Sequence, residues 1–303
     1  MSHQIKFGVT IFISMANLKE IKNRITSVSS TMQITSAMKM VSAAKLKRAQ
    51  DAITQLKPYS IKLQEILGNL TASLDLSENA FSHVRDENNV LVIAISSNRG
   101  LCGGFNNNIL KKVNELINAT YTNSNVSLLC YGKKITDSFR RSPLRLDNEI
   151  FGTSDIFADL SYTNAASITE EIIEQFLAKK FDKVVVVYNS FINASVQEVK
   201  VEQLLPIVPT ASNETSVNEY FFEPSKVEIV DQLIPKSLKI QLFKSLLDSY
   251  ASEHGARMTA MHKATDNAKE LKRNLTLTYN KARQAAITNE ILEIVGGAEA
   301  LNN

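Results

Sequence analysis

The sequence contains no tryptophan and only two cysteines, Cys102 and Cys130, among its 303 residues. Two cysteines make no disulfide framework, which favours a reducing compartment. No apolar run approaches the ~20 residues that a membrane-spanning helix needs, so no transmembrane segment is expected. The aromatic content of 7% suits long helices better than one large globular core. The net charge of +3 is small, and overall charge therefore does not argue for a nucleic-acid partner.

Groups that commonly carry catalysis are few and scattered. The four histidines, His3, His83, His254 and His262, form no recognisable set with Cys102. His254 and His262 do not have metal-ligand spacing. We find no carboxylate pair with a shared setting and no Ser-His-Asp pattern. We therefore expect a chain that is not itself an enzyme and that needs no cofactor or metal.

The stretch from Tyr250 to Leu292 has the most regular spacing in the chain. Its residues recur alternately four and three apart, which predicts the seam of a left-handed coiled coil. Alanines let a partner helix approach closely, but Arg257 and Asn289 would be costly in a dry core. The stretch is either an Ala-rich dimer zipper or a helix whose partners change along its length or with time. The predicted seam comprises Tyr250, His254, Arg257, Met261, Ala264, Ala268, Leu271, Leu275, Thr278, Ala282, Ala285, Asn289 and Leu292.

A second seam lies near the N-terminus. It would next fall on Thr35 and Lys39, where the apolar pattern fails. Apolar residues shift instead to Met38, Val41, Ala44, Ala52, Ile53 and Leu56. The helix is rich in lysine and arginine, which indicates either a solvated face or a surface for an acidic protein or nucleic acid. The seam comprises Leu18, Ile21, Ile25, Val28 and Met32.

The middle of the chain has the pattern of a small α/β layer. Continuous apolar runs predict strands covered on both faces, and helical patterns separate them. This alternation implies a largely parallel sheet. The predicted strands are 90–95, 126–130 and 184–188, with 196–207 as an added edge hairpin, and the predicted helices are 109–117, 133–141 and a third one capped by Ser167.

The C-terminal part is expected to be helical. Ser225 can cap a short helix, and Pro235 would end it and begin the next one. Gly296-Gly297 would break that second helix, which at ~1.5 Å per residue would be a rod of roughly 90 Å. The economical arrangement pairs it antiparallel with the N-terminal helix.

The predicted fold is therefore an α/β insert on a long antiparallel two-helix coiled coil formed by the N- and C-terminal helices. Residues before Met15 match neither a signal peptide nor a mitochondrial transit peptide, and we expect Met15 to be the natural start. The predicted parts are an upstream extension at 1–14 that is not ordered, the N-terminal coiled-coil helix at 15–72, a Rossmann-like insert at 73–224 and the C-terminal coiled-coil helix at 225–303.

Residues 97–106 form a glycine-rich turn between a predicted strand and a predicted helix. Such a turn can place backbone N–H groups around a phosphate. Its spacing is neither G-x-G-x-x-G nor that of a P-loop, so a structural tight turn is favoured.

The C-terminal end carries apolar residues on more than one face of its last turns, between Ile287 and Leu301. A helix tip of this kind needs enclosure, and we expect another protein to provide it.

Four stretches, at 17–45, 97–106, 220–224 and 256–288, carry a resemblance to a known family. Together they span nearly everything after Met15. The chain closely resembles the gamma subunit of the F-type ATP synthase, and a bacterial member fits better than a mitochondrial one.

The resemblance implies a central rotor shaft. Such a shaft enters a head of alternating alpha and beta subunits, and its rotation drives the three beta catalytic sites through different conformations. Its base and α/β insert rest on the membrane c-ring and the epsilon subunit. The implied location is peripheral, on the cytoplasmic side of the bacterial plasma (inner) membrane, with the matrix side of the mitochondrial inner membrane as the alternative.

The resemblance also implies roles for individual residues. The expected contact regions are four. Two belong to the beta subunits, their acidic lever and their catch loop. The third is an apolar bearing at the top of the head, and the fourth is at the base of the shaft. The expected beta-subunit contacts are Met38, Lys39, Arg283 and Gln284, the expected bearing residues are Ile291, Leu292, Val295 and Leu301, and the expected base contacts are Arg99, Tyr220 and Glu223.

Two other classes of protein stay open on the residues alone. One is a self-associating coiled-coil scaffold. The other is a small-molecule-binding α/β protein that uses the glycine-rich turn.

Overall fold

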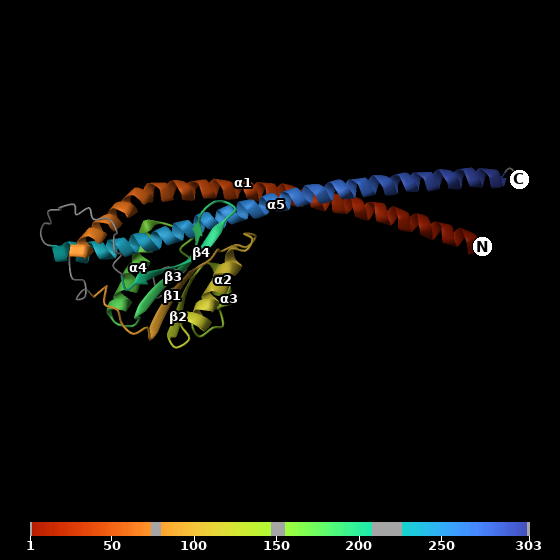
Figure 1. Cartoon of the computed structure of the whole chain (residues 1–303). Coiled ribbons are helices and arrows are strands. Elements are labelled where there is room, and N and C mark those ends of the chain that lie inside the picture. The colour runs from red at the N-terminus through yellow and green to blue at the C-terminus, as the bar shows by residue number, and fades with distance from the viewer. Residues whose placement is uncertain (1, 74–79, 147–154, 208–225, 302–303) are drawn as a thin grey trace. The chain divides into compact units, whose positions relative to one another are not determined.

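The computed structural model describes residues 2–73, 80–146, 155–207 and 226–301 (Figure 1). The chain divides into two compact units. We call Met1–Val41 with Ala260–Asn303 the helix-pair unit, and Ser42–Thr259 the sheet unit. Helix α1, Ser2–Ser73, and helix α5, Lys226–Leu301, each contribute to both units.

Helices α1 and α5 continue through residues that we expected to interrupt them. Pro235 lies inside α5, because Ile234 and Leu238 on either side of it are buried in the core at 1% and 2% exposure, and their packing offsets the lost hydrogen bond. The predicted short helix ending at Pro235 is thus wrong. Gly296 and Gly297 also lie within α5, since one glycine weakens a helix by only ~1 kcal/mol.

The sheet unit is built on a four-stranded sheet in the order β2-β1-β3-β4. Strand β1 pairs in parallel with β2 and β3, and β3 pairs antiparallel with β4. The predicted parallel layer and its added edge hairpin are therefore confirmed. The strands are β1 Asn89–Ile95, β2 Asn125–Tyr131, β3 Lys183–Phe191 and β4 Gln197–Leu205.

Helix α4, Tyr162–Leu177, begins earlier than predicted. Its N-cap is Ser161, whose Oγ accepts a hydrogen bond from the backbone N–H of Asn164 at 3.4 Å. Ser167 lies inside the helix because Ala165 and Ile168 are fully buried against the sheet, which extends the helix by a further turn. The other helices of the sheet unit are α2 Phe105–Glu115, which continues as a π-helical turn at Leu116–Thr120, and α3 Lys133–Ser138.

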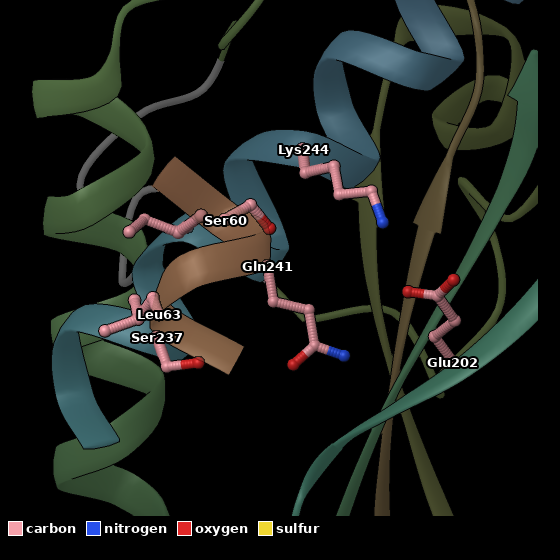
Figure 2. A pocket seen from close by; sticks show the side chains of 7 residues that line it. Ser60, Leu63, Glu202, Ser237, Gln241 and Lys244 are labelled. Carbon is pink, nitrogen blue, oxygen red and sulfur yellow. The ribbon is translucent and has the colours of Figure 1, made fainter. Parts of the chain in front are cut away.

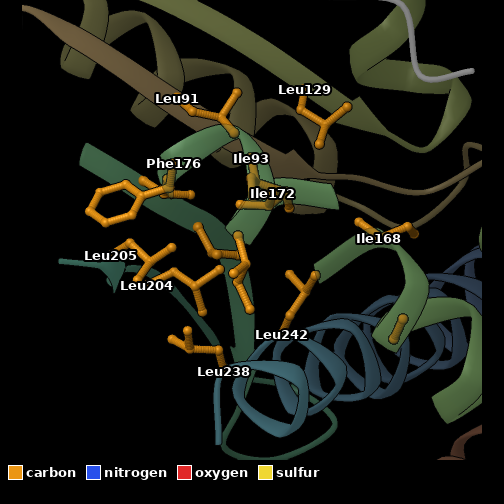
Figure 3. Close-up of a cluster of buried hydrophobic side chains, with 14 of the residues drawn as sticks. Leu91, Ile93, Leu129, Ile168, Ile172, Phe176, Leu204, Leu205, Leu238 and Leu242 are labelled. Carbon is orange, nitrogen blue, oxygen red and sulfur yellow. The ribbon is translucent and has the colours of Figure 1, made fainter. Parts of the chain in front are cut away.

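Side chains alternate along β1 between two cores, as a strand covered on both faces requires. Val90 and Val92 face the cluster that includes α2 and α3. Leu91 and Ile93 face the cluster of α4 and α5, where Leu242 of α5 is completely buried (Figure 3). Burying one such leucine stabilises a fold by ~1.5–3 kcal/mol, so this part of α5 belongs to the core of the sheet unit.

In the helix-pair unit, α1 and α5 run antiparallel. Thr265 Oγ1 lies 2.8 Å from Thr35 Oγ1, and Lys272 Nζ lies 3.0 Å from Ser29 Oγ. As the residue number rises along α5, the number of its partner on α1 therefore falls. Together with the mixed sheet, this confirms the predicted fold class.

The predicted seam of α5 is confirmed at Tyr250, His254, Arg257, Ala264 and Ala282, which are buried or half-buried, but it is wrong at Asn289 and Leu292, which are exposed. Met261 and Ala268 are buried and Leu275 is half-buried, as expected. From Leu271 onward, the intermediate position lies one residue later than predicted: Lys272, Tyr279 and Ala286 are half-buried, whereas Leu271, Thr278 and Ala285 are exposed. Thr265 is half-buried beside the predicted Ala264.

The predicted shift of the apolar residues on α1 is wrong at Val41 and Ala44, which are exposed, whereas Met38, Ala52, Ile53 and Leu56 are half-buried. The seam continues through Thr35 and Ser42, which are 8% and 2% exposed, while Val41 is 58% exposed. The Thr35 hydroxyl can lie inward because it is within hydrogen-bond distance of Thr265 Oγ1 across the seam and of the Met32 carbonyl in its own helix. A prediction based on apolar residues alone therefore misses the buried positions Thr35 and Ser42.

Candidate functional site

The glycine-rich turn, residues 97–106, follows β1 and is closed by its own side chains. Asn106 Oδ1 accepts a hydrogen bond from the backbone N–H of Ser97 at 3.0 Å, and Ser97 Oγ donates to the Arg99 carbonyl at 2.6 Å. Leu101 and Gly103 have positive φ angles of 62° and 60°. Left-handed backbone of this kind reverses the chain tightly, so the segment is a rigid turn.

Arg257 of α5 clamps this turn from outside. Its Nη2 donates to the Arg99 carbonyl at 2.9 Å and to the Gly100 carbonyl at 3.2 Å. Its Nη1 pairs with Glu253 Oε1 at 2.7 Å, and the two side chains are only 8% and 9% exposed. The arginine that looked costly in a dry seam is therefore fully engaged in hydrogen bonds.

The titratable groups around the clamp are perturbed chiefly by burial. Burial raises the pKa of the Glu253 carboxyl, and the Arg257 guanidinium opposes that rise. Burial, with the cations of Arg257 and Lys45, lowers the pKa of His254 to about 3, so its ring is neutral at pH 7. Burial also raises the pKa of the Cys102 thiol, which makes it a poor nucleophile.

Helix α5 occupies the region where an open α/β sheet would bind a ligand, beyond the carboxyl ends of its parallel strands. Ser252 Oγ donates to the Asn189 carbonyl at the end of β3 at 3.0 Å. A Cβ added at Gly255 would lie only 3.2 Å from Ala194 Cα. Because α5 covers the end of β3 and the Ser97 N–H is already donated to Asn106 Oδ1, the arrangement favours a structural turn over a phosphate cradle.

A polar pocket of about 230 Å³ lies between α1, β4 and α5 in the sheet unit (Figure 2). Ser60, Glu202, Gln241 and Lys244 line part of it. Glu202 already accepts a hydrogen bond of 2.6 Å from the buried Tyr188 hydroxyl, and Gln241 donates to the Gln203 carbonyl. Among the described residues, no cluster of three metal-ligating side chains is present. Gln241 therefore joins α5 to β4, and Glu202 joins β4 to β3.

The helix-pair unit exposes a series of large apolar side chains. Each is between 48% and 66% exposed, and every residue from Ile291 to Ala298 is exposed. Soluble proteins rarely leave such a surface uncovered, which marks it as an interaction surface. The exposed apolar residues are Ile34, Met40, Val41, Leu271, Leu277, Ile287, Ile291, Leu292, Ile294 and Val295.

The predicted contact residues lie in different settings. Met38 and Lys39 of α1 are half-buried, and Lys39 Nζ lies 3.4 Å from His262 Nδ1 on α5. Arg283 and Gln284 are exposed. Arg99 is exposed on the glycine-rich turn. Ile291, Leu292 and Val295 are exposed, whereas Tyr220, Glu223 and the side chain of Leu301 lie outside the described residues.

Sequence comparison decides which family this architecture belongs to. A family model described as ATP synthase matches residues 17–301. An ATP synthase gamma chain from Christiangramia forsetii is 57% identical over 290 residues, which cover 95% of this chain and 100% of the relative. The chain belongs to the ATP synthase gamma chain family. Another gamma chain, from Geobacter sp., is 47% identical over 95% of this chain and 99% of its own length.

Solved structures of ATP synthases have the same fold. A chain of the Euglena gracilis mitochondrial ATP synthase matches with a TM-score of 0.63 and 20% identity, covering 94% of this chain and 95% of that one. A chain from the central stalk and c-ring of the Tetrahymena thermophila enzyme matches with a TM-score of 0.55 and 24% identity, covering 76% of this chain and 99% of that one. The gamma chain is a non-catalytic stalk subunit of ATP synthase, which agrees with the expectation from the sequence.

Within the described residues, no helix is both long enough and apolar enough to span a membrane.

Proposed function

We propose that this gamma chain is the rotating shaft that couples ion flow through the membrane c-ring to ATP synthesis or hydrolysis at the beta subunits. The observation that carries the proposal is the uncovered apolar end of α5. Ile291, Leu292 and Val295 are 52–64% exposed, and a surface of this kind needs a socket supplied by other chains. The alpha and beta subunits of the head are the proposed socket, with these three residues and Leu301 as the bearing.

The contacts with the beta subunits are proposed for both helices of the helix-pair unit. Exposed Arg283 and Gln284 can hydrogen-bond a beta-subunit loop, and an arginine offers five donors in a fixed planar group. Lys39, next to Met38 on α1, would provide a positive charge toward an acidic segment of the beta subunit. Because the bound surface must change as the shaft turns, binding one angular position too tightly would trap it there.

The base contacts and the location follow the same proposal. Arg99, Tyr220 and Glu223 would contact the epsilon subunit and the c-ring. The bacterial relatives support a membrane-associated complex, and we place the chain on the cytoplasmic side of the plasma membrane.

Substitution of Arg283 tests the proposed beta-subunit contact. Arg283→Ala should weaken head–shaft binding roughly tenfold, since truncating an anchoring interface arginine costs more than ~1 kcal/mol. The chain itself should fold normally, because Arg283 is exposed. Lys281→Ala, a nearby exposed cation, is the matched control. Unchanged ATP synthesis and hydrolysis in assembled Arg283→Ala complexes would contradict the proposed contact.

Purification from its own source separates the three classes of function. Co-elution with alpha and beta subunits supports the shaft. A pure homodimer would support the coiled-coil scaffold, and nucleotide binding by the isolated chain would support the small-molecule-binding protein.

A further inference from the structure

Two threonines meet in the seam of the helix-pair unit. Thr35 is 8% exposed, Thr265 is half-buried, and their Oγ1 atoms lie 2.8 Å apart. Each hydroxyl also lies within hydrogen-bond distance of a carbonyl in its own helix, Met32 for Thr35 at 3.1 Å and Met261 for Thr265 at 2.8 Å. A hydroxyl has one proton, so one threonine donates across the seam and the other donates to its own helix.

The alanines of this seam do little to define the register of the two helices, although its apolar part also includes Met261 and Leu275. On α5 it contains Ala264, Ala268 and Ala282, which are buried or half-buried. A small alanine fits almost any hole on the facing helix, whereas large branched side chains fit only a few. Sliding α1 along α5 by one heptad would therefore change the alanine packing little.

We infer that Thr35 and Thr265 are positioning residues that fix the register of α1 against α5. A slip of one heptad could place Thr265 opposite the half-buried Val28, and its hydroxyl would lose the partner across the seam. A polar pair at a seam position is a known means of specifying register in coiled coils.

A second polar pair agrees with this register. Lys272 lies seven residues after Thr265, and Ser29 lies six residues before Thr35. Lys272 Nζ donates to Ser29 Oγ at 3.0 Å. The two pairs are thus about two helical turns apart and are satisfied together in one alignment of the helices.

The consequence for function rests on the function proposed above. The register sets the axial level of Lys39 on α1 relative to Arg283 on α5, and these are two of the proposed beta-subunit contacts. A slip of one heptad would displace them by about 10 Å at 1.5 Å per residue. Such a shaft could contact the beta subunits at one level but not at both.

Distance measurement on the isolated full chain tests the register directly. Spin labels on cysteines introduced at the exposed positions Gln33 and Asn280 report the axial alignment, and both native cysteines are buried. The double variant Thr35→Val/Thr265→Val should keep its helical content but show a second distance population, displaced by up to about 10 Å. The single variant Thr35→Ser keeps a hydroxyl at this position and should show one distance population, as the unsubstituted chain does.

Thr276→Val is the matched control, because this exposed threonine hydrogen-bonds only to the Lys272 carbonyl of its own helix. It should leave the distance distribution unchanged. A single, unshifted population in the Thr35→Val/Thr265→Val variant would overturn the inference, whatever that variant does in the complex.

Assembled complexes supply the second readout. The double variant should hydrolyse ATP but lose ion pumping per ATP hydrolysed, and Thr35→Ser should retain it. A shifted distance population with unchanged pumping would support the register role and contradict the proposed function. The failure of the register inference is therefore distinguishable from the failure of the proposed function.

Discussion

Removal of the Arg257 side chain tests the clamp that joins α5 to the glycine-rich turn. In Arg257→Met, Glu253 stays buried at 7% exposure without its ion-pair partner. The carbonyls of Arg99 and Gly100 lose their donors as well. Breaking a buried ion pair on one side typically costs about 3–5 kcal/mol, which is a large share of the ~5–15 kcal/mol that stabilises a typical domain.

A double variant separates the cost of the unpaired Glu253 charge from the cost of the hydrogen bonds that the two carbonyls lose. Arg257→Met/Glu253→Met replaces both partners with apolar side chains of similar length, and such replacements are often neutral or stabilising. The two carbonyls still lack their donors, so we expect partial recovery, by about 2 kcal/mol or more relative to Arg257→Met. Urea unfolding of the isolated chain, followed by circular dichroism, measures both variants.

The effect of Arg257→Met also depends on pH. Without the guanidinium, nothing of comparable strength opposes the effect of burial, and the pKa of Glu253 rises further above its ordinary value of 4.5. An acid whose folded-state pKa is raised contributes stability below its unfolded pKa and loses it as the pH rises through the folded pKa. The deficit of Arg257→Met should thus be largest at pH 8 and smaller at pH 5. Any one of three results would refute the reasoning. The loss of unfolding free energy in Arg257→Met could be below ~1 kcal/mol, it could be independent of pH, or the double variant could be no more stable than Arg257→Met.

Three further predictions test other parts of the structure. Gly255→Ala should destabilise the chain by ~1 kcal/mol or more, because a Cβ 3.2 Å from Ala194 Cα overpacks the contact. Gly296→Ala is the control, because its added Cβ would have nothing within 4 Å. It should instead slow the exchange of backbone amide hydrogens around position 296. His254 has a pKa lowered to about 3 from 6.5, so it contributes stability above pH 6.5 that is lost as the pH falls toward 3. The free energy of urea unfolding of His254→Gln should therefore decline less steeply over that pH range than that of the unsubstituted chain. An equal decline would contradict the lowered pKa of His254. Ile291→Ser/Leu292→Ser should leave the isolated chain folded but reduce its assembly with the head, since each buried side chain is worth ~1.5–3 kcal/mol; undiminished co-purification would rule these residues out of the bearing.

The sheet could be predicted from sequence because its strands carry an unmistakable local signal. Val184–Tyr188 is a continuous apolar run, and the structure buries it within β3, between two helical layers. Long-range contacts carry no such local signal. Arg257 and Arg99 are 158 residues apart, so nothing in the spacing of either could reveal the clamp that joins them.

The seam shows how far a periodic pattern can specify a coiled coil. Spacing placed Met261 and Ala268 correctly, because apolar residues repeat there every seven positions. It failed at Thr265 and Thr35, where hydrogen bonds across the seam turn polar side chains inward. A pattern that scores apolarity alone must miss these positions, and they are the ones to which we assign the register.

Observation of rotation tests the central claim most directly. The assembled complex would be immobilised through its head, and a bead would be attached to this chain through a cysteine introduced in the sheet unit. Our account predicts sustained rotation of the bead in one direction when ATP is supplied, and arrest when ATP is removed. A chain that stays in the complex during ATP hydrolysis without turning would contradict it.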